Sequence, residues 1–214
     1  MAIDHHHMPA REHWDQVYAN RPADRVSWYQ MHAARSLRLI RETSVPLGAS
    51  IIDVGGGAST LVDDLLHAGF LALTVLDISG AALAAAQARA GPRAGRVRWV
   101  EADISSVALP ADAYDVWHDR AVFHFLTSPE DRRAYVAAAL HAVKRGGHVI
   151  VATFAEDGPT QCSGLPVMRY SAASLQAEFG APFVLLRHEQ EEHQTPSGDT
   201  QKFVYCHFRK ETTT

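Results

Sequence analysis

The sequence has few cysteines and no long apolar run. Its two cysteines, Cys162 and Cys206, are too few for the disulfide framework of a small secreted domain and fit a reducing cytosol. No apolar run approaches the roughly 20 residues that cross a membrane, and the N-terminus MAIDHHHMPA lacks the apolar centre of a signal peptide. We therefore expect a cytoplasmic protein with no membrane partner.

An excess of positive charge is also missing. Lys and Arg number 20 against 24 Asp and Glu, which gives a net charge of −4, and no long basic run occurs. Tight, sequence-independent binding to nucleic acid needs many cationic contacts to phosphate, so a nucleic-acid partner is not expected. A length of 214 residues with 47% hydrophobic residues suits one domain with one core.

The stretch IIDVGGGAST (residues 51–60) organises the rest of the chain. An apolar run leads into three glycines and then into apolar residues at helical spacing, which predicts a buried strand, a tight turn and a helix start. Glycine lets the backbone turn sharply and lets a ligand approach without a Cβ in the way. The first helical turn leaves backbone N–H groups free for polar ligand atoms.

The glycine pattern itself narrows the choice of ligand. Asp53, Gly55, Gly57 and Ser59 give D-x-G-x-G-x-S. This pattern differs from the dinucleotide-binding G-x-G-x-x-G, and no lysine follows the glycines as it does in a phosphate-binding P-loop. The next predicted strand, 71–76, ends in Asp77, which follows Asp53 at close to the ~20-residue interval at which an acid meets a nucleotide ribose.

Polar residues also follow the fourth predicted strand, 114–117. They are His118, Asp119 and Arg120, and ligands of an open α/β sheet bind at such carboxyl ends. His118 and His124 are our candidates for a general base. His124 stands between two phenylalanines, so a satisfied position in the core or in the wall of a pocket is the alternative for it.

The order of the predicted elements indicates an α/β fold. A fifth strand is expected at 148–154, and strands at 183–189 and 202–209 are joined through turn residues typical of a hairpin. The prediction is a doubly wound, mostly parallel seven-stranded sheet with a C-terminal antiparallel hairpin and helices on both faces. We expect a disordered or added tail at 1–10 and a single domain at 11–214, divided into a helical arm (11–44), a core (49–154), a lid-like loop (155–170) and a C-terminal helix and hairpin (171–210).

Four segments together resemble one family in order and spacing. Residues 53–60, Asp77, Asp103 with Ile104, and 118–120 resemble the motifs of the class I, seven-stranded, Rossmann-like S-adenosylmethionine-dependent methyltransferases. The arm and the terminal hairpin extend the likeness to compact bacterial-type members. The glycine pattern and the hairpin disfavour the rival class, a dinucleotide-dependent oxidoreductase. The resemblance implies S-adenosylmethionine as cofactor, S-adenosylhomocysteine as product, and methyl transfer by in-line displacement.

The resemblance also implies the site residues. In this family the arm covers the donor and closes the acceptor pocket. The implied cofactor residues are Trp14, Tyr18, Asp53, Gly55, Gly57, Ser59, Thr60, Asp77, Ile78, Asp103, Ile104, His118, Asp119 and Arg120. The expected acceptor contacts are Trp28, Tyr29, Phe123, Cys162 and Arg169. The alternative for the aromatic residues of the arm is that they anchor it to the core.

The acceptor is first expected to be a small molecule. The sequence has no N-P-P-Y or D-P-P-Y run, no Pro-Cys pair and no C-terminal nucleic-acid domain. A protein methyltransferase of the lysine type is the second hypothesis, because D-x-x-V-F (residues 119–123) faintly resembles that group. A domain that binds S-adenosylmethionine without catalysis is the third. No metal is expected, since the strand positions of His193, Cys206 and His207 favour packing over ligation.

Overall fold

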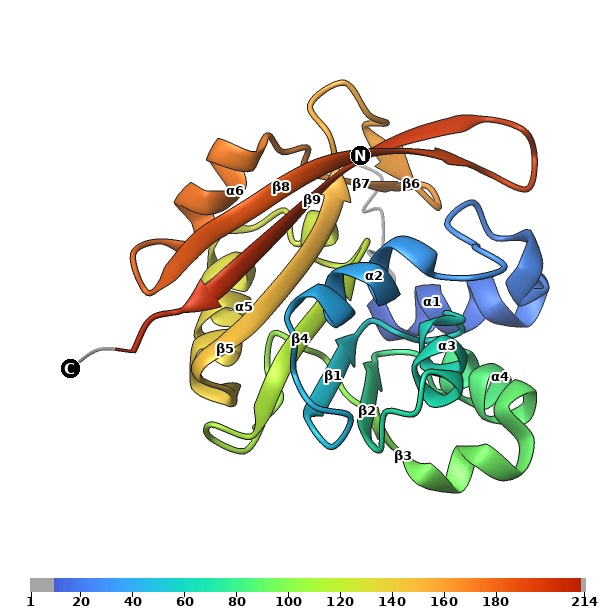
Figure 1. Ribbon diagram of the computed structural model, residues 1–214. Coiled ribbons are helices and arrows are strands. Elements are labelled where there is room, and N and C mark those ends of the chain that lie inside the picture. The colour runs from blue at the N-terminus through green and yellow to red at the C-terminus, as the bar shows by residue number, and fades with distance from the viewer. Residues whose placement is uncertain (1–9, 213–214) are drawn as a thin grey trace.

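The computed structural model describes residues 10–212 of the chain. Seven strands form one sheet in the order β3-β2-β1-β4-β5-β9-β8 (Figure 1). The strands are β1 (Ser50–Val54), β2 (Ala72–Asp77), β3 (Val97–Glu101), β4 (Tyr114–Arg120), β5 (Val143–Phe154), β8 (Phe183–Gln194) and β9 (Thr200–Lys210). The pairs from β3 to β5 are parallel, and β9 is antiparallel to both β5 and β8. The predicted fold class is confirmed.

Helices cover both faces of this sheet. They are α1 (Ala10–Asn20), α2 (Ala34–Glu42), α3 (Leu61–His67), α4 (Gly80–Ala90), α5 (Pro129–Ala142) and α6 (Ala172–Phe179), with short 3-10 helices η1 (Ala23–Arg25), η2 (Gly91–Arg96) and η3 (Phe123–Phe125). One buried apolar cluster holds residues of α2, α3 and α4, and another holds residues of α5 and α6. Figure 1 shows α2 and α3 in front of the sheet, with α5 and α6 away from them beside β5 and β8.

The strand order reverses between β1 and β4. The first crossovers place β2 and β3 on one side of β1, and the chain then returns to place β4 on the other side. At such a switch point the connections leave in opposite directions, so a crevice opens at the carboxyl ends of the strands. Asp53 at the end of β1 pairs in register with His118 of β4 at this crevice.

Several predicted boundaries need correction. The fifth strand, expected at 148–154, begins at Val143, because Val143 already pairs with Tyr114. The expected lid-like loop at 155–170 contains a small antiparallel hairpin, β6 (Gln161–Cys162) with β7 (Leu165–Pro166). Of the tail expected at 1–10, residues 1–9 lie outside the described residues.

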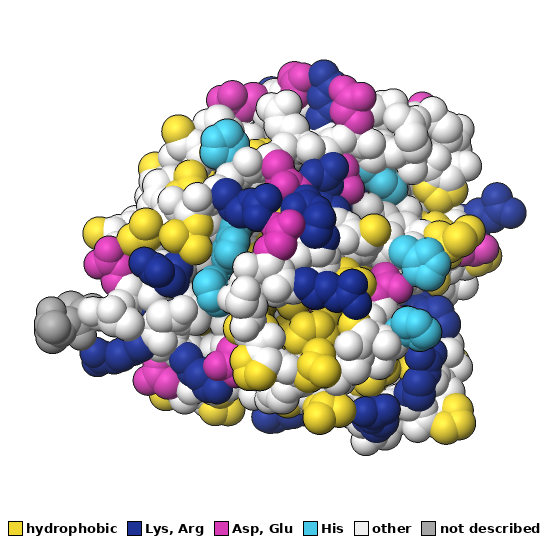
Figure 2. Space-filling view, in the orientation of Figure 1, with side chains coloured by type: hydrophobic (Ala, Val, Ile, Leu, Met, Phe, Trp, Pro, Cys, Tyr) yellow, Lys and Arg dark blue, Asp and Glu magenta, His cyan; other side chains and the backbone are white. Residues whose placement is uncertain are grey.

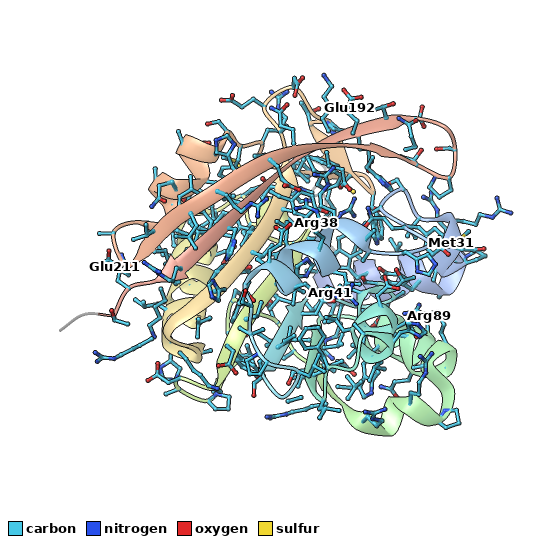
Figure 3. The ribbon with its side chains drawn as sticks, in the orientation of Figure 1. Met31, Arg38, Arg41, Arg89, Glu192 and Glu211 are labelled. Atoms are coloured by element: carbon cyan, nitrogen blue, oxygen red, sulfur yellow. The ribbon has the colours of Figure 1, made fainter. Side chains whose placement is uncertain are left out.

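The terminal hairpin is longer than predicted, and it holds α2 in place. Its turn closes through the Thr195 amide, which donates to the Asp199 carbonyl at 2.8 Å. Charged side chains of both signs gather over α2 and β8 in the centre of the face in Figure 2. Arg35 and Arg38 of α2 pair with Glu189 of β8, and Figure 3 marks α2 by Arg38 and Arg41. Across residues 10–212, no helix has the length and apolar character that a membrane crossing requires.

Candidate active site

The glycine turn after β1 is too crowded for side chains. Gly55 and Gly57 have φ values of +66° and +32°, which L residues rarely adopt. A Cβ on Gly55 would lie 1.9 Å from Cγ2 of Val122, and one on Gly57 would lie 2.5 Å from Oδ2 of Asp77. The turn therefore requires glycine for both its conformation and its space.

A cavity of about 550 Å³ lies at the carboxyl ends of the strands. The strand ends and the glycine turn form one side of its wall, and α1, the segment after it and the β6–β7 hairpin form the other. The predicted site residues in this wall are Trp14, Tyr18, Trp28, Tyr29, Asp53, Gly55, Ser59, Thr60, Asp77, Ile78, Asp103, Ile104, His118, Arg120 and Cys162. Residues from the predicted donor and acceptor sets thus share one cavity.

Asp77 is a buried carboxylate at the end of β2. Its Oδ1 accepts a hydrogen bond from the Ser79 amide at 2.8 Å. Burial raises the pKa of Asp77 to about 7, and the nearby carboxylates of Asp53 and Asp15 also raise it. The group can therefore accept hydroxyl hydrogens from a ligand, but close to neutral pH part of it is protonated.

Asp53 and His118 form a buried pair at the switch point. Oδ1 of Asp53 lies 2.7 Å from Nδ1 of His118, and Nε2 of His118 lies 2.8 Å from Oγ of Ser36 on α2. Both imidazole nitrogens are therefore engaged. Oδ2 of Asp53 is buried and has no partner among the residues described, although Asp53 lines the cavity. This free oxygen marks a place for an N–H donor of a ligand.

Asp119 does not line the cavity, which corrects its expected cofactor contact. Its oxygens accept the Val122 amide at 2.9 Å, the Phe123 amide at 3.0 Å and the Tyr135 hydroxyl at 2.6 Å. Burial raises its pKa to about 6, which these hydrogen bonds counteract. The carboxylate therefore holds the turn after β4 rather than a ligand.

The structure also corrects the roles expected for Phe123 and His124. Phe123 packs in the core against Tyr135 and Phe179. Nδ1 of His124 accepts the Phe154 amide at 3.2 Å, and burial, with a smaller effect of Arg120, lowers the pKa of His124 to about 3. Neither residue lines the cavity, so His124 occupies the buried core position that was part of its alternative and is not placed to act as a base.

Arg120 lies in the cavity wall with its charge already paired. Its guanidinium donates to the Tyr205 hydroxyl at 2.8 Å, to the Trp28 carbonyl at 3.1 Å and to Glu191 at 3.2 Å. It therefore joins the arm to the terminal hairpin. Arg169, in contrast, is exposed, donates to the Gly158 carbonyl at 3.4 Å and is absent from the wall, which corrects its expected acceptor contact.

The aromatic residues of the arm both pack together and line the cavity. Trp14 makes edge-to-face contacts with Trp28 and Phe125 at centroid distances of 5.7 and 5.0 Å. Tyr18 lies 6.3 Å from Trp28. The same side chains thus anchor the arm to the core and cover the cavity. Cys162 enters the wall from β6, and burial raises the pKa of its thiol to about 11, so the thiol is neutral at physiological pH.

Some wall residues were not among the predicted site residues. His13, Ser36 and Asp131 line the cavity, and Nε2 of His13 is buried without a partner among the described residues. His13 begins the H-W-D-x-x-Y pattern that resembles the family's arm, whereas Ser36 and Asp131 are common polar residues that only the folded arrangement identifies. Gly57 was predicted as a cofactor contact but does not itself line the cavity, since it lies against Asp77.

Two histidines of the terminal hairpin make hydrogen-bond contacts within the protein. His193 contacts the Ser27 carbonyl at 2.8 Å, and His207 contacts His148 at 2.9 Å. Cys206 is a buried free thiol. Over the part of the chain that the structure covers, no three His, Cys, Asp or Glu side chains are grouped so that they could hold a metal ion.

Comparison with known proteins gives a family match and several similar folds. Residues 51–147 match the methyltransferase domain family. A S-adenosylmethionine-dependent methyltransferase from Anabaena variabilis is 16% identical with a TM-score of 0.73, covering 94% of this chain and 93% of its own. A structure reported for the conversion of a disulfide bond into a thioacetal group during echinomycin biosynthesis is 17% identical with a TM-score of 0.75, over 95% and 93% of the two chains.

A third similar structure is named as a cyclase rather than as a methyltransferase. The cyclase SpnF is 18% identical with a TM-score of 0.69, covering 94% of this chain and 92% of its own. These likenesses to solved structures establish the fold. No curated protein sequence matches this chain.

Proposed function

We propose that this chain, whose core is a class I, Rossmann-like methyltransferase domain that uses S-adenosylmethionine, transfers the donor's methyl group to a small-molecule acceptor. The domain and its cofactor follow from the family match over residues 51–147 together with the seven-stranded sheet. The acceptor class is our inference. The observation that carries it is the cavity of about 550 Å³, which is covered by the arm and by the β6–β7 hairpin.

The residues of the cavity fit the proposed donor. Gly55 and Gly56 line the cavity without side chains, so a ligand can approach the backbone of the turn there. Asp77 would accept the ribose hydroxyls, and the free Oδ2 of Asp53 would accept an N–H of the donor's ammonium group. Oδ1 of Asp103 already accepts from the amide and hydroxyl of Ser105, so its other oxygen would serve the adenine amine.

The bound donor supplies a methyl group that its positively charged sulfur has already activated. The task of the protein is then to hold the acceptor in line and to exclude water. Trp14, Tyr18 and Trp28 provide an aromatic cover for this purpose. Because His118 has both nitrogens engaged, we assign it to positioning rather than to direct deprotonation of the acceptor.

The walls left for the acceptor are mostly apolar. Tyr29, Cys162, Leu165 and Pro166 line the cavity beside the aromatic cover, and the charge of Arg120 is compensated by Glu191. The volume is in the range of small-molecule sites, roughly 300–1,000 Å³. A cavity covered on two sides suits a small, largely apolar molecule better than a polypeptide. We place the reaction in the cytoplasm, since both cysteines are free thiols.

The likeness to a cyclase favours one second candidate. Since a structural neighbour with this fold is named for cyclisation, the fold does not by itself require methyl transfer. The second candidate is therefore a domain that binds S-adenosylmethionine without transferring its methyl group.

Methyl-labelled S-adenosylmethionine tests the proposal. The protein is incubated with the labelled donor and a bacterial extract that is then separated into small molecules and macromolecules. The proposal expects label in the small-molecule fraction. Label on protein alone would overturn the acceptor class, and donor binding without label in either fraction would favour the second candidate.

A further inference from the structure

Ser36, His118 and Asp53 form a continuous buried chain beside the cavity. Nε2 of His118 lies 2.8 Å from the Ser36 hydroxyl, and its Nδ1 lies 2.7 Å from Oδ1 of Asp53. All three residues are at most 4% exposed and all three line the cavity. A carboxylate only accepts hydrogen bonds, so Nδ1 of His118 donates to Asp53, and Nε2 is hydrogen-bonded to the Ser36 hydroxyl.

These hydrogen bonds involve only one of the two oxygens of the Asp53 carboxylate. Oδ1 is held by His118, whereas Oδ2 is buried with no partner in the described part of the chain. A buried charged oxygen without a partner is costly, so such an atom in a cavity wall indicates a ligand that donates to it. The amino-acid end of the proposed donor carries an ammonium group of matching charge and hydrogen-bonding character.

Ser36 reaches His118 because α2 is held against the donor side of the cavity. The Thr60 hydroxyl donates to the Gln30 carbonyl at 3.0 Å, and the Ala33 amide donates to Asp64 at 2.7 Å. These contacts join the segment before α2 to the start of α3. The position of the Ser36 hydroxyl therefore depends on how the arm is seated.

We propose that Ser36 is a positioning residue for the amino-acid end of the donor, and that it acts through His118 on Asp53. Ser36 fixes the imidazole, the imidazole fixes the carboxylate, and Oδ2 is left for the ligand. The arm thereby contributes to donor affinity through a side chain that does not itself belong to the glycine turn or to the acidic strand ends. This inference rests on the proposed donor but not on the identity of the acceptor.

Two ligands separate this role from a general structural one. S-adenosylhomocysteine has an amino-acid end, and 5′-methylthioadenosine has the adenine, ribose and sulfur but lacks that end. In calorimetric titrations, Ser36→Ala should bind S-adenosylhomocysteine about three- to tenfold more weakly, as expected for the loss of one hydrogen bond. Its affinity for 5′-methylthioadenosine should stay within about twofold of the wild type, because the adenosine contacts are untouched.

Thr43→Ala is the matched control. Thr43 follows the same helix, and its hydroxyl donates to the Ile40 carbonyl without lining the cavity. This variant should bind both ligands like the wild type. Equal weakening of both ligands by Ser36→Ala, or no weakening of either, would overturn the proposal.

A double-mutant cycle tests the path through His118. In a His118→Phe background, Ser36→Ala should cause no further loss of S-adenosylhomocysteine affinity, because the connecting imidazole is gone. A full additional loss would refute the path. If the wild type bound no S-adenosylhomocysteine, both this inference and the proposed donor would fail. If the wild type bound it but methylated no small molecule, only the proposed acceptor would fail.

Discussion

The Asp15 carboxylate of α1 accepts a hydrogen bond from the Ser79 hydroxyl at 2.6 Å. It also accepts from the Ala81 amide at 3.3 Å, at the start of α4. The Ser79 amide in turn donates to Asp77. The arm that covers the cavity is therefore fastened next to the carboxylate that we assign to the ribose.

Loss of this fastening should release the donor faster. Asp15→Ala removes a charged acceptor from two donors, and we expect the dissociation rate of S-adenosylhomocysteine to rise roughly tenfold. Stopped-flow fluorescence of Trp14 and Trp28 would measure it, since both line the cavity. Glu12→Ala is the control, because Glu12 is exposed on the same helix. An unchanged rate for Asp15→Ala would show that α1 does not retain the donor.

Donor affinity should depend on pH through Asp77. Its pKa is raised to about 7, chiefly by burial, and only the ionised carboxylate offers all its lone pairs to two hydroxyls. The affinity for S-adenosylhomocysteine should therefore rise from pH 6 to pH 8, by up to roughly tenfold per pH unit below the pKa. Calorimetry across this range provides the test, and a flat profile for the wild type would contradict the assignment.

The same group should act oppositely on the stability of the free protein. Between its ordinary pKa of 3.8 and about 7, Asp77 keeps a proton that the unfolded chain has lost, so its contribution to stability falls as the pH rises. Asp77→Asn should then bind S-adenosylhomocysteine more weakly with no such pH dependence, yet be more stable than the wild type at pH 8. Weaker binding together with lower stability at that pH would point to a purely structural role.

Some features of the site could be predicted from the sequence, and others could not. The places of the glycine turn after β1 and of Asp77 at the end of β2 were predictable, because strand, turn and helix start are local patterns that the fold combines in a fixed order. Asp119 was not, because its partner Tyr135 lies 16 residues away on the next helix. Likewise, Nε2 of His118 is hydrogen-bonded to Ser36, which lies 82 residues earlier in the chain. Only the folded arm brings the two residues together.

Tyr135→Phe should destabilise the protein without weakening donor binding. The buried Tyr135 hydroxyl donates to Asp119 and accepts from the Trp117 indole at 2.8 Å. Its removal leaves both partners short of a hydrogen bond, which should cost about 1–3 kcal/mol of unfolding free energy. Urea unfolding would give this value. A large loss of S-adenosylhomocysteine affinity in the folded variant would indicate that Asp119 contributes to donor binding after all.

His124 should remain neutral well below the usual range of histidine. Its pKa is lowered to about 3 by burial, while the unfolded chain takes up the proton near 6.5. The unfolded state thus binds more protons between these values, and the contribution of His124 to stability is lost as the pH falls through this interval. Nitrogen chemical shifts from NMR would report the protonation state. An imidazolium signal assigned to His124 at pH 5 in the folded protein would contradict its buried position.

A calorimetric titration of S-adenosylhomocysteine into the wild type and Gly55→Val tests most directly whether this cavity holds the methyl donor. A side chain at Gly55 would begin 1.9 Å from Val122, at a backbone φ of +66°. We expect saturable binding to the wild type and loss of binding to the variant, with circular dichroism confirming that the variant is folded. No binding to the wild type, or equal binding to a folded Gly55→Val, would contradict the claim that this cavity holds the methyl donor.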